Sequence, residues 1–162
     1  NDFFKIPEPL IQKEFSRIMS LKDGLKKMSK SELSDLGRIN LTDEKDQISN
    51  KIKKAKTDSL PIPSKVEELN NRPEARNLLS IYASLANLSL EKSIQEFSGK
   101  NFSEFKEILS QILIEKINPI SIEIKKLLNE KKYLDTILLE GSQKADKIAS
   151  EKVKKIHEIV GF

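Results

Sequence analysis

Apolar residues recur every three or four positions over most of the chain after residue 72, which is the spacing of an amphipathic helix. One run starts at Pro73, a residue that fits the first turn of a helix, and continues to about residue 88. A second run follows Ser89 and stops at Gly99, because serine favours helix N-termini and glycine favours C-termini. These patterns predict two short helices joined by a tight connection.

Two longer apolar stripes follow and predict two longer helices. The first extends from Phe102 to Ile117 and resumes after Pro119, where the missing N–H should kink or break the helix. The second covers about residues 133–160. We expect both stripes to pack into a shared core, which predicts a mainly α fold arranged as a helical bundle.

A fifth helix is predicted over about residues 43–56. Thr42 and Asp43 supply N-cap chemistry, and the acidic first turns and basic last turns complement the helix dipole. Its narrow apolar stripe leaves the lysines to face solvent or a ligand. Solvated lysines and nucleic-acid contacts both remain open for this basic run. The stripe is Ile48, Ile52 and Ala55, and the lysines are Lys51, Lys53, Lys54 and Lys56.

The first 41 residues show no such periodicity. Pro7 and Pro9 favour a short extended segment, and residues 12–31 follow neither a helical nor a strand pattern. The chain starts at Asn1 without a methionine and carries an apolar pair, Phe3 and Phe4, close to that end. We therefore expect further sequence upstream.

Composition narrows the class of protein. The chain has 162 residues, of which 37% are apolar and 33% charged, and its mean hydropathy is -0.47, as in a folded globular domain. No run approaches the roughly 20 apolar residues that span a bilayer, and no signal peptide is evident, so we expect a cytoplasmic protein. Zero cysteines exclude disulfides and thiolate chemistry, and the single His157 leaves little room for metal or triad chemistry.

The positive charge is concentrated near the start of the chain. Residues 1–56 carry 13 Lys and Arg against 9 Asp and Glu, whereas residues 57–162 carry 16 of each kind. This asymmetry favours an anionic partner close to the opening segment.

Residues 26–31 hold the densest chemical signal. Three lysines and two serines follow a turn at Asp23 and Gly24. Lysines offer mobile charges to phosphate oxygens, and serine hydroxyls with backbone N–H groups add neutral donors. Such a segment can stabilise charge that builds on a phosphate during a reaction. A solvated, lysine-rich loop is the simpler alternative.

The surrounding residues favour the phosphate interpretation through a resemblance. Lys27-Met28-Ser29-Lys30-Ser31, the lysine-serine loop, resembles the signature loop of class I aminoacyl-tRNA synthetases. Further segments resemble the C-terminal half of bacterial tryptophanyl-tRNA synthetases, and together they span the chain. These segments are Arg17 to Leu21, Lys53 to Ser59, Arg72 to Leu79, and Val160 to Phe162.

The resemblance implies an activity and a role for each loop residue. Members of the family convert ATP and tryptophan to tryptophanyl-adenylate and pyrophosphate, and then transfer the aminoacyl group to tRNA. Lys27 and Lys30 would stabilise the pyrophosphate leaving group, Ser29 and Ser31 would donate hydrogen bonds, and Met28 would lie near the adenine. ATP would enter with Mg²⁺, and no metal bound by the protein itself is expected.

The resemblance also implies an organisation into two parts. Residues 1–41 would close a nucleotide-binding α/β catalytic domain as a short loop or strand remnant, and residues 42–162 would form a helical tRNA-binding domain of the anticodon-binding type. Arg72 and Arg76 are candidates for tRNA contacts, because guanidinium groups suit that task. The tryptophan pocket would lie upstream, so this fragment alone should be inactive.

Other partners and a competing function complete the expectations. The resemblance implies the tRNA for tryptophan as a partner and a homodimer when full length, with no membrane association. Tyrosyl-tRNA synthetases fit the segments at Thr57 and Arg72 less well. The alternative is a freestanding helical RNA-binding or interaction module without catalysis.

Overall fold

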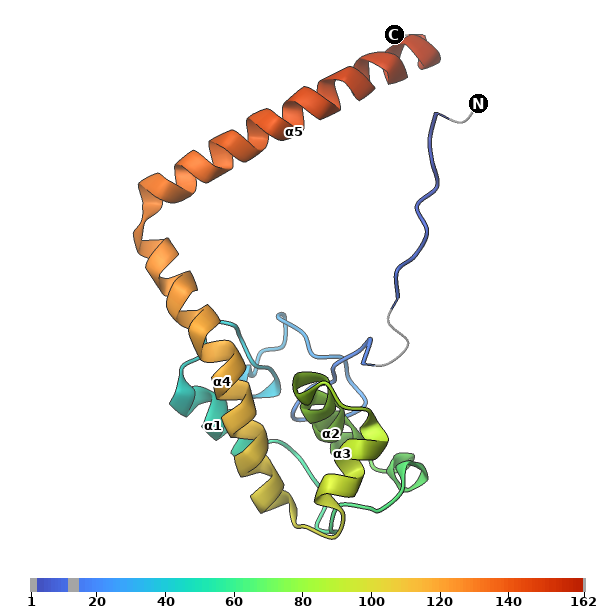
Figure 1. Ribbon diagram of the computed structural model, residues 1–162, viewed down its shortest axis with the longest axis vertical. Coiled ribbons are helices and arrows are strands. Elements are labelled where there is room, and N and C mark those ends of the chain that lie inside the picture. Colours follow the sequence, from blue (N-terminus) through green and yellow to red (C-terminus); the bar gives the residue numbers. More distant parts are fainter. Residues whose placement is uncertain (1–2, 12–14, 162) are drawn as a thin grey trace. The chain divides into compact units, whose positions relative to one another are not determined.

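The computed structural model describes residues 3–11 and 15–161 (Figure 1). Within them, the only β pairing is a single antiparallel bridge between Met19 and Lys27. The helices are η1 (Asp35–Gly37), α1 (Lys45–Lys53), η2 (Val66–Leu69), α2 (Pro73–Ala86), α3 (Leu90–Phe97), α4 (Phe102–Asn129) and α5 (Lys131–Val160), where η marks a 3-10 helix. The prediction of a mainly helical fold preceded by a short strand-like remnant is confirmed.

The chain divides into two compact units, Asn1–Ile120 and Ser121–Phe162. The first unit continues from the irregular opening segment into α1, α2, α3 and the first part of α4 (Figure 1). The predicted domain boundary between residues 41 and 42 is a different division from this one, and it stays a prediction.

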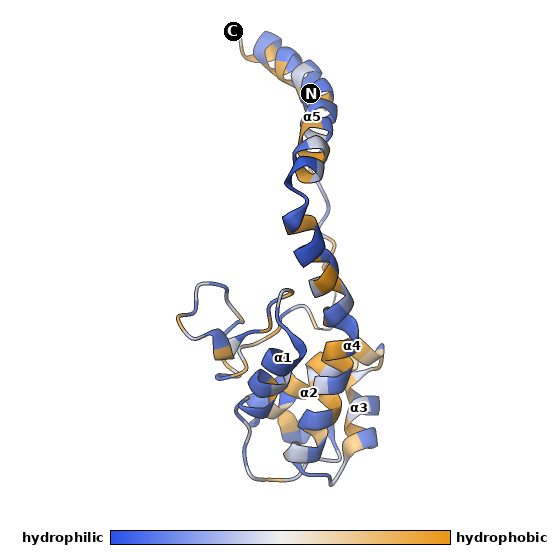
Figure 2. Cartoon of the chain, turned by 90° about the vertical axis from the view of Figure 1, so that its left-hand side faces the viewer, coloured by the Kyte–Doolittle hydropathy of each residue, from blue (hydrophilic) through white to orange (hydrophobic). Residues whose placement is uncertain are grey.

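Aromatic side chains from three helices form the centre of the first unit. Tyr82 of α2 and Phe97 of α3 meet edge to face with ring centroids 4.8 Å apart, and Phe105 of α4 lies 4.9 Å from Phe97. Ile48 and Ile52 of α1 are fully buried, as the predicted stripe requires. Figure 2 shows hydrophobic residues on the facing sides of α2, α3 and α4. The core is therefore built where these helical stripes meet.

The ends of α2 and α3 follow the predicted signals. Pro73 occupies the first turn of α2. The Ser89 hydroxyl accepts a hydrogen bond from the Lys92 N–H at the start of α3 (3.4 Å), and Gly99 beyond its end has a φ of +77° that side-chain-bearing residues rarely adopt. Both helices are confirmed within two residues of their expected ends.

The start of α1 differs from the expectation. The helix begins at Lys45 after Glu44, whose N–H donates to the Gln47 side chain (2.8 Å), so the predicted cap at Thr42 and Asp43 is wrong. Asp43 instead accepts hydrogen bonds from the Asn40 N–H (2.9 Å) and from Lys51 (2.6 Å). Its carboxylate is thus used within the fold.

Helix α4 continues through Pro119 without interruption, so the predicted alternative of a break there is wrong. Proline removes one N–H donor and crowds the preceding turn, at a cost of about 3 kcal/mol inside a helix. The helical hydrogen bonds on either side and the buried first half of α4 offset this loss. The boundary between the two compact units falls one residue later, after Ile120.

Helix α5 does not bury its apolar stripe. None of its described residues is buried, with Ile137 47% and Leu138 69% exposed. Figure 2 shows hydrophobic residues along the length of this helix. The prediction that this stripe packs into a common core is wrong, because the second unit holds only the end of α4 and α5 and offers no further layer to cover it. Among the described helices, none has the length and hydropathy needed to cross a membrane.

Lys51 is buried instead of solvated, which corrects the expectation for one lysine of the α1 run. Only 3% of the residue is exposed, and its ammonium group lies 2.6 Å from Asp43 and 2.5 Å from Asp35. The hydrogen bond from Lys51 is the main reason that the pKa of Asp35 lies below its ordinary value. Arg38 adds a second cation 2.9 Å from Asp35. This ion-pair network ties residues 35–43 to α1.

Replacing Lys51 with methionine should destabilise the first unit by about 3 kcal/mol, since it leaves Asp43 buried without its cation. Urea denaturation at neutral pH would measure this loss. Lys53→Met on the exposed side of α1 is the matched control and should change the free energy of unfolding by less than about 0.5 kcal/mol. Equal effects of the two substitutions would contradict a structural role for Lys51.

Candidate functional site

The lysine-serine loop continues directly from the second arm of a short hairpin formed by residues 18–28. The Ser20 N–H donates to the Lys26 carbonyl (2.7 Å) and the Met28 N–H donates to the Ile18 carbonyl (3.0 Å). These bonds flank the paired residues Met19 and Lys27. The backbone at Lys27 is therefore held by the hairpin.

The turn of the hairpin lies against the start of α2. A Cβ atom added at Gly24 would come within 2.5 Å of the Glu74 nitrogen and the Pro73 carbonyl carbon. The Glu74 side chain pairs with Lys56 at 2.7 Å, and the hydrogen bond from Lys56 is the main reason that the pKa of Glu74 lies below its ordinary value. Glycine is required here because the two backbones approach closely.

Four of the five loop residues line one pocket of about 450 Å³. Lys27, Ser29 and Lys30 are exposed, whereas Met28 is half-buried against the hydrophobic core. Ser31 does not line the pocket, and its N–H donates to the Ser29 hydroxyl (3.2 Å). The remaining lining residues are Ser16, Arg17, Ile18, Arg38, Ile39, Asn40 and Leu41.

Arg38 lines this pocket, although it was not predicted from the sequence. Its guanidinium donates to the Glu32 carbonyl (2.8 Å) and to the Asn40 side chain (3.2 Å), besides pairing with Asp35. The ion-pair network around Lys51 thus positions part of the pocket. Arg17 lies in a segment that carried the resemblance, but no sequence pattern pointed to Arg38.

The lining favours a polyanionic ligand. Two ammonium groups, two guanidinium groups and serine hydroxyls line the pocket, and no carboxylate is among its lining residues. Flexible ammonium groups can follow phosphate oxygens, whereas a guanidinium held by its neighbours offers a fixed set of donors. The arrangement suits binding of phosphate groups whose charge changes during a reaction.

Arg72 has a structural task. Its guanidinium forms a bidentate pair with Asp58 at 2.8 and 2.7 Å and donates to the carbonyls of Leu60 (3.2 Å) and Pro61 (3.0 Å). It also lies over the Phe102 ring at 5.7 Å. Its planar fork therefore holds the loop before η2 against α2.

Arg76 is exposed and makes a weaker contact. Its guanidinium donates to the Asn70 side chain at 3.4 Å, and it lines a pocket of about 290 Å³ together with Arg17. Contacts of Arg72 and Arg76 with tRNA stay predictions.

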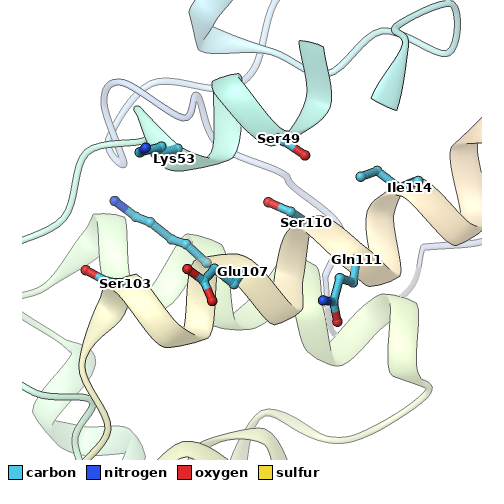
Figure 3. A pocket seen from close by; sticks show the side chains of 8 residues that line it. Ser49, Lys53, Ser103, Glu107, Ser110, Gln111 and Ile114 are labelled. Carbon is cyan, nitrogen blue, oxygen red and sulfur yellow. The ribbon is translucent and has the colours of Figure 1, made fainter. Parts of the chain in front are cut away.

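A third pocket lies between α1 and α4, with a volume of about 420 Å³ (Figure 3). Lys53 of α1 and Lys106 of α4 both line it. The Lys106 ammonium donates to the Ala55 carbonyl (2.7 Å), and burial lowers the pKa of Lys106. This pocket shares no residue with the pocket at the lysine-serine loop. Solvation and nucleic-acid contact both remain open for Lys53.

Within residues 3–11 and 15–161, no three His, Cys, Asp or Glu side chains are grouped so that they could hold a metal ion.

Comparison with known proteins identifies the family. The family model described as tRNA synthetases class I (W and Y), for tryptophan and tyrosine, matches residues 1–118. The chain belongs to this family. A tryptophan–tRNA ligase from Mesorhizobium japonicum is 48% identical over 162 residues, which are 100% of this chain and 46% of that protein. One from Rickettsia felis is 50% identical over 161 residues, covering 99% of this chain and 48% of the relative.

Solved structures of the class I family show the same fold. A tryptophanyl-tRNA synthetase from Mycoplasma pneumoniae superposes with a TM-score of 0.74 at 26% identity, over 93% of this chain and 45% of that one. One from Campylobacter jejuni, complexed with ADP and tryptophan, gives a TM-score of 0.68 at 26% identity, over 99% of this chain and 48% of that one. The chain spans about half the length of the relatives it matches.

Gly24→Ala should displace the hairpin from α2, because the added methyl group would meet backbone atoms that cannot rotate away. We expect a loss of about 1–3 kcal/mol in the free energy of unfolding, as for other overpacked sites. Gly141→Ala, where an added Cβ meets no atom within 4 Å, is the control and should be neutral or slightly stabilising. Unchanged stability of Gly24→Ala in thermal or urea denaturation would contradict the close packing.

Acid should weaken the clamp between Asp58 and Arg72. The hydrogen bond from Arg72 is the main cause that lowers the pKa of Asp58 from its ordinary value of 3.8. The stabilisation is therefore complete above about pH 4 and is lost as the pH falls through the lowered folded-state pKa. Asp58→Asn should be less stable than wild type at neutral pH and lose less stability between pH 7 and about pH 3.

Urea titrations at both pH values would measure the effect. Asp135→Asn, an exposed substitution in α5, should keep the pH dependence of wild type. A wild-type pH dependence in Asp58→Asn would show that this pair does not contribute to acid sensitivity.

Proposed function

We propose that the chain is the C-terminal half of a tryptophan–tRNA ligase and supplies the pyrophosphate side of its ATP site. The observation that carries this proposal is the convergence of Lys27 and Lys30 with Arg17 and Arg38 on one pocket. The family match and the names of relatives at 48% and 50% identity support the choice of substrates.

The proposed reaction begins with ATP and tryptophan. The tryptophan carboxylate forms a bond to the α-phosphorus of ATP, the bond from that phosphorus to the bridging oxygen breaks, and pyrophosphate leaves with the electron pair. Lys27 and Lys30 stabilise the negative charge that builds on the leaving oxygens. Exposure of both ammonium groups lets them follow the phosphates as the bond lengthens.

The other loop residues have supporting roles in the proposal. Ser29 donates from its hydroxyl at the rim of the pocket, and Ser31 supports the turn through its bond to Ser29. Met28 contributes an apolar surface for the adenine. ATP enters as its Mg²⁺ complex, and the phosphates carry the ion to the site.

The second step transfers the tryptophanyl group to the terminal adenosine of tRNA. We assign residues 1–41 to the end of the catalytic domain and residues 42–162 to a tRNA-binding domain of the anticodon-binding type. Arg76 is the better candidate for a phosphate or base contact, because Arg72 is engaged with Asp58. The tryptophan pocket, the contacts of a homodimer and a cytoplasmic location belong to the proposed full-length enzyme.

Lys27→Ala and Lys30→Ala in the full-length protein should each lower kcat for tryptophan-dependent ATP–pyrophosphate exchange by about 10²-fold, as expected when a donor to developing charge is lost. Binding of tRNA should change less than about twofold, because each substitution removes at most one phosphate contact. Filter binding at fixed salt measures that affinity.

Lys22→Ala provides a matched control, since Lys22 is exposed on the same hairpin but does not line the pocket. It should keep wild-type exchange. Equal losses of exchange and tRNA binding in the Lys27 and Lys30 variants would refute the leaving-group role. The isolated 162-residue chain should show no exchange, and activity above background would refute the need for a second half.

A further inference from the structure

Asn77 is a buried polar residue of α2 that the proposed function does not use. It is 5% exposed, and its side chain both accepts a hydrogen bond from the hairpin and donates hydrogen bonds to it. Its Oδ1 accepts from the Met19 N–H at 2.9 Å, and its Nδ2 donates to the carbonyls of Met19 at 2.8 Å and Ser20 at 3.4 Å. Met19 and Asn77 are 58 positions apart in the sequence, so this is a tertiary contact.

The hairpin geometry explains why Met19 needs this partner. Met19 and Lys27 form a pair whose hydrogen bonds are made by the residues on either side. In such a pair, the backbone N–H and C=O of each residue point away from the other arm. The Asn77 amide satisfies both groups of Met19, as a third strand would. Asn77 thereby fixes the arm against which Lys27 is paired.

A second contact on α2 prevents the hairpin from sliding along this helix. Glu74 lies one turn before Asn77, and a Cβ atom added at Gly24 would come within 2.5 Å of the Glu74 nitrogen. The close approach of Gly24 to Pro73 fixes the turn of the hairpin. Contacts at the turn and at the base determine both the position and the direction of the hairpin.

The two lysines of the lysine-serine loop differ in how they are held. Lys27 lies on the paired arm, whereas Lys30 follows in an exposed segment that ends near the fully exposed Leu33. A displacement of the hairpin would therefore move the backbone of Lys27 directly. It would affect Lys30 less, because that residue lies beyond the paired arms.

We propose that Asn77 is a positioning residue that sets the place of Lys27 at the ATP phosphates, a role that rests on the function proposed above. The amide acts through Met19 and the hairpin bridge, and it touches no substrate. Its contribution should appear in the chemical step and depend on the Lys27 side chain.

The test is a double-mutant cycle in the full-length protein, with ATP–pyrophosphate exchange as the readout. Asn77→Ala should lower kcat about tenfold and leave KM for tryptophan unchanged, since misplaced groups lose transition-state contacts. In the Lys27→Ala background, the same change should cost less than about twofold. In the Lys30→Ala background, it should again cost about tenfold.

Two further variants and a measurement of amide exchange separate positioning from loss of folding. Ile94→Val removes a buried methylene from α3, makes no change at the hairpin, and should keep kcat despite a lower melting temperature. Asn77→Asp keeps the shape and the acceptor but loses the donor to Met19, so it should lower kcat in the same way. Amide exchange of Met19 and Met28 should accelerate in Asn77→Ala, which loses the acceptor of the Met19 N–H, and remain slow in Ile94→Val.

The outcomes distinguish this inference from the proposed function. A tenfold loss on adding Asn77→Ala to Lys27→Ala, or wild-type kcat in both Asn77 variants while Lys27→Ala is impaired, would overturn the positioning role alone. Wild-type exchange in Lys27→Ala would overturn the proposed function first. Faster Met19 exchange together with a loss of kcat confined to the native Lys27 background supports the inference.

Discussion

An irregular backbone that is covered by helices must still find hydrogen-bond partners, and this requirement organises the first unit. Residues 15–44 and 54–72 contain almost no regular structure, so long polar side chains satisfy their peptide groups. Asn77 bonds to Met19, Arg72 to the carbonyls of Leu60 and Pro61, and Lys106 to Ala55. The helices thus act as a frame that holds the loops through specific polar contacts.

This construction gives the candidate site two kinds of cation. Arg38 is held by carbonyl, amide and carboxylate partners, and the Lys51 ion pairs fix the segment from which it extends. Lys27 and Lys30 are exposed and keep the freedom of their side chains. A site that combines fixed and mobile positive charges can bind phosphate groups and still adjust as charge moves.

The chain spans about half the length of its relatives, and its two units differ in whether their apolar stripes are buried. The apolar stripe of α5 is exposed in the second unit, while the stripes of α2, α3 and the first part of α4 are buried in the first. Periodicity alone predicts a helix equally well in both cases, because it reports which face is apolar and not what covers that face. The difference lies in the neighbours that each unit provides.

The sequence by itself determined the helices, the lysine-serine loop and the resemblance that linked them, because these depend on residues close together in the chain. Only the tertiary structure decided which charged residues are structural. Lys51 and Arg72 looked like surface or nucleic-acid cations, yet they pair with Asp43 and Asp58. Asn77 lies in a segment that carried the resemblance, but no sequence pattern pointed to its role. An amide finds its role only when folding brings a distant peptide group within hydrogen-bond distance, and local sequence patterns carry no information about that distance.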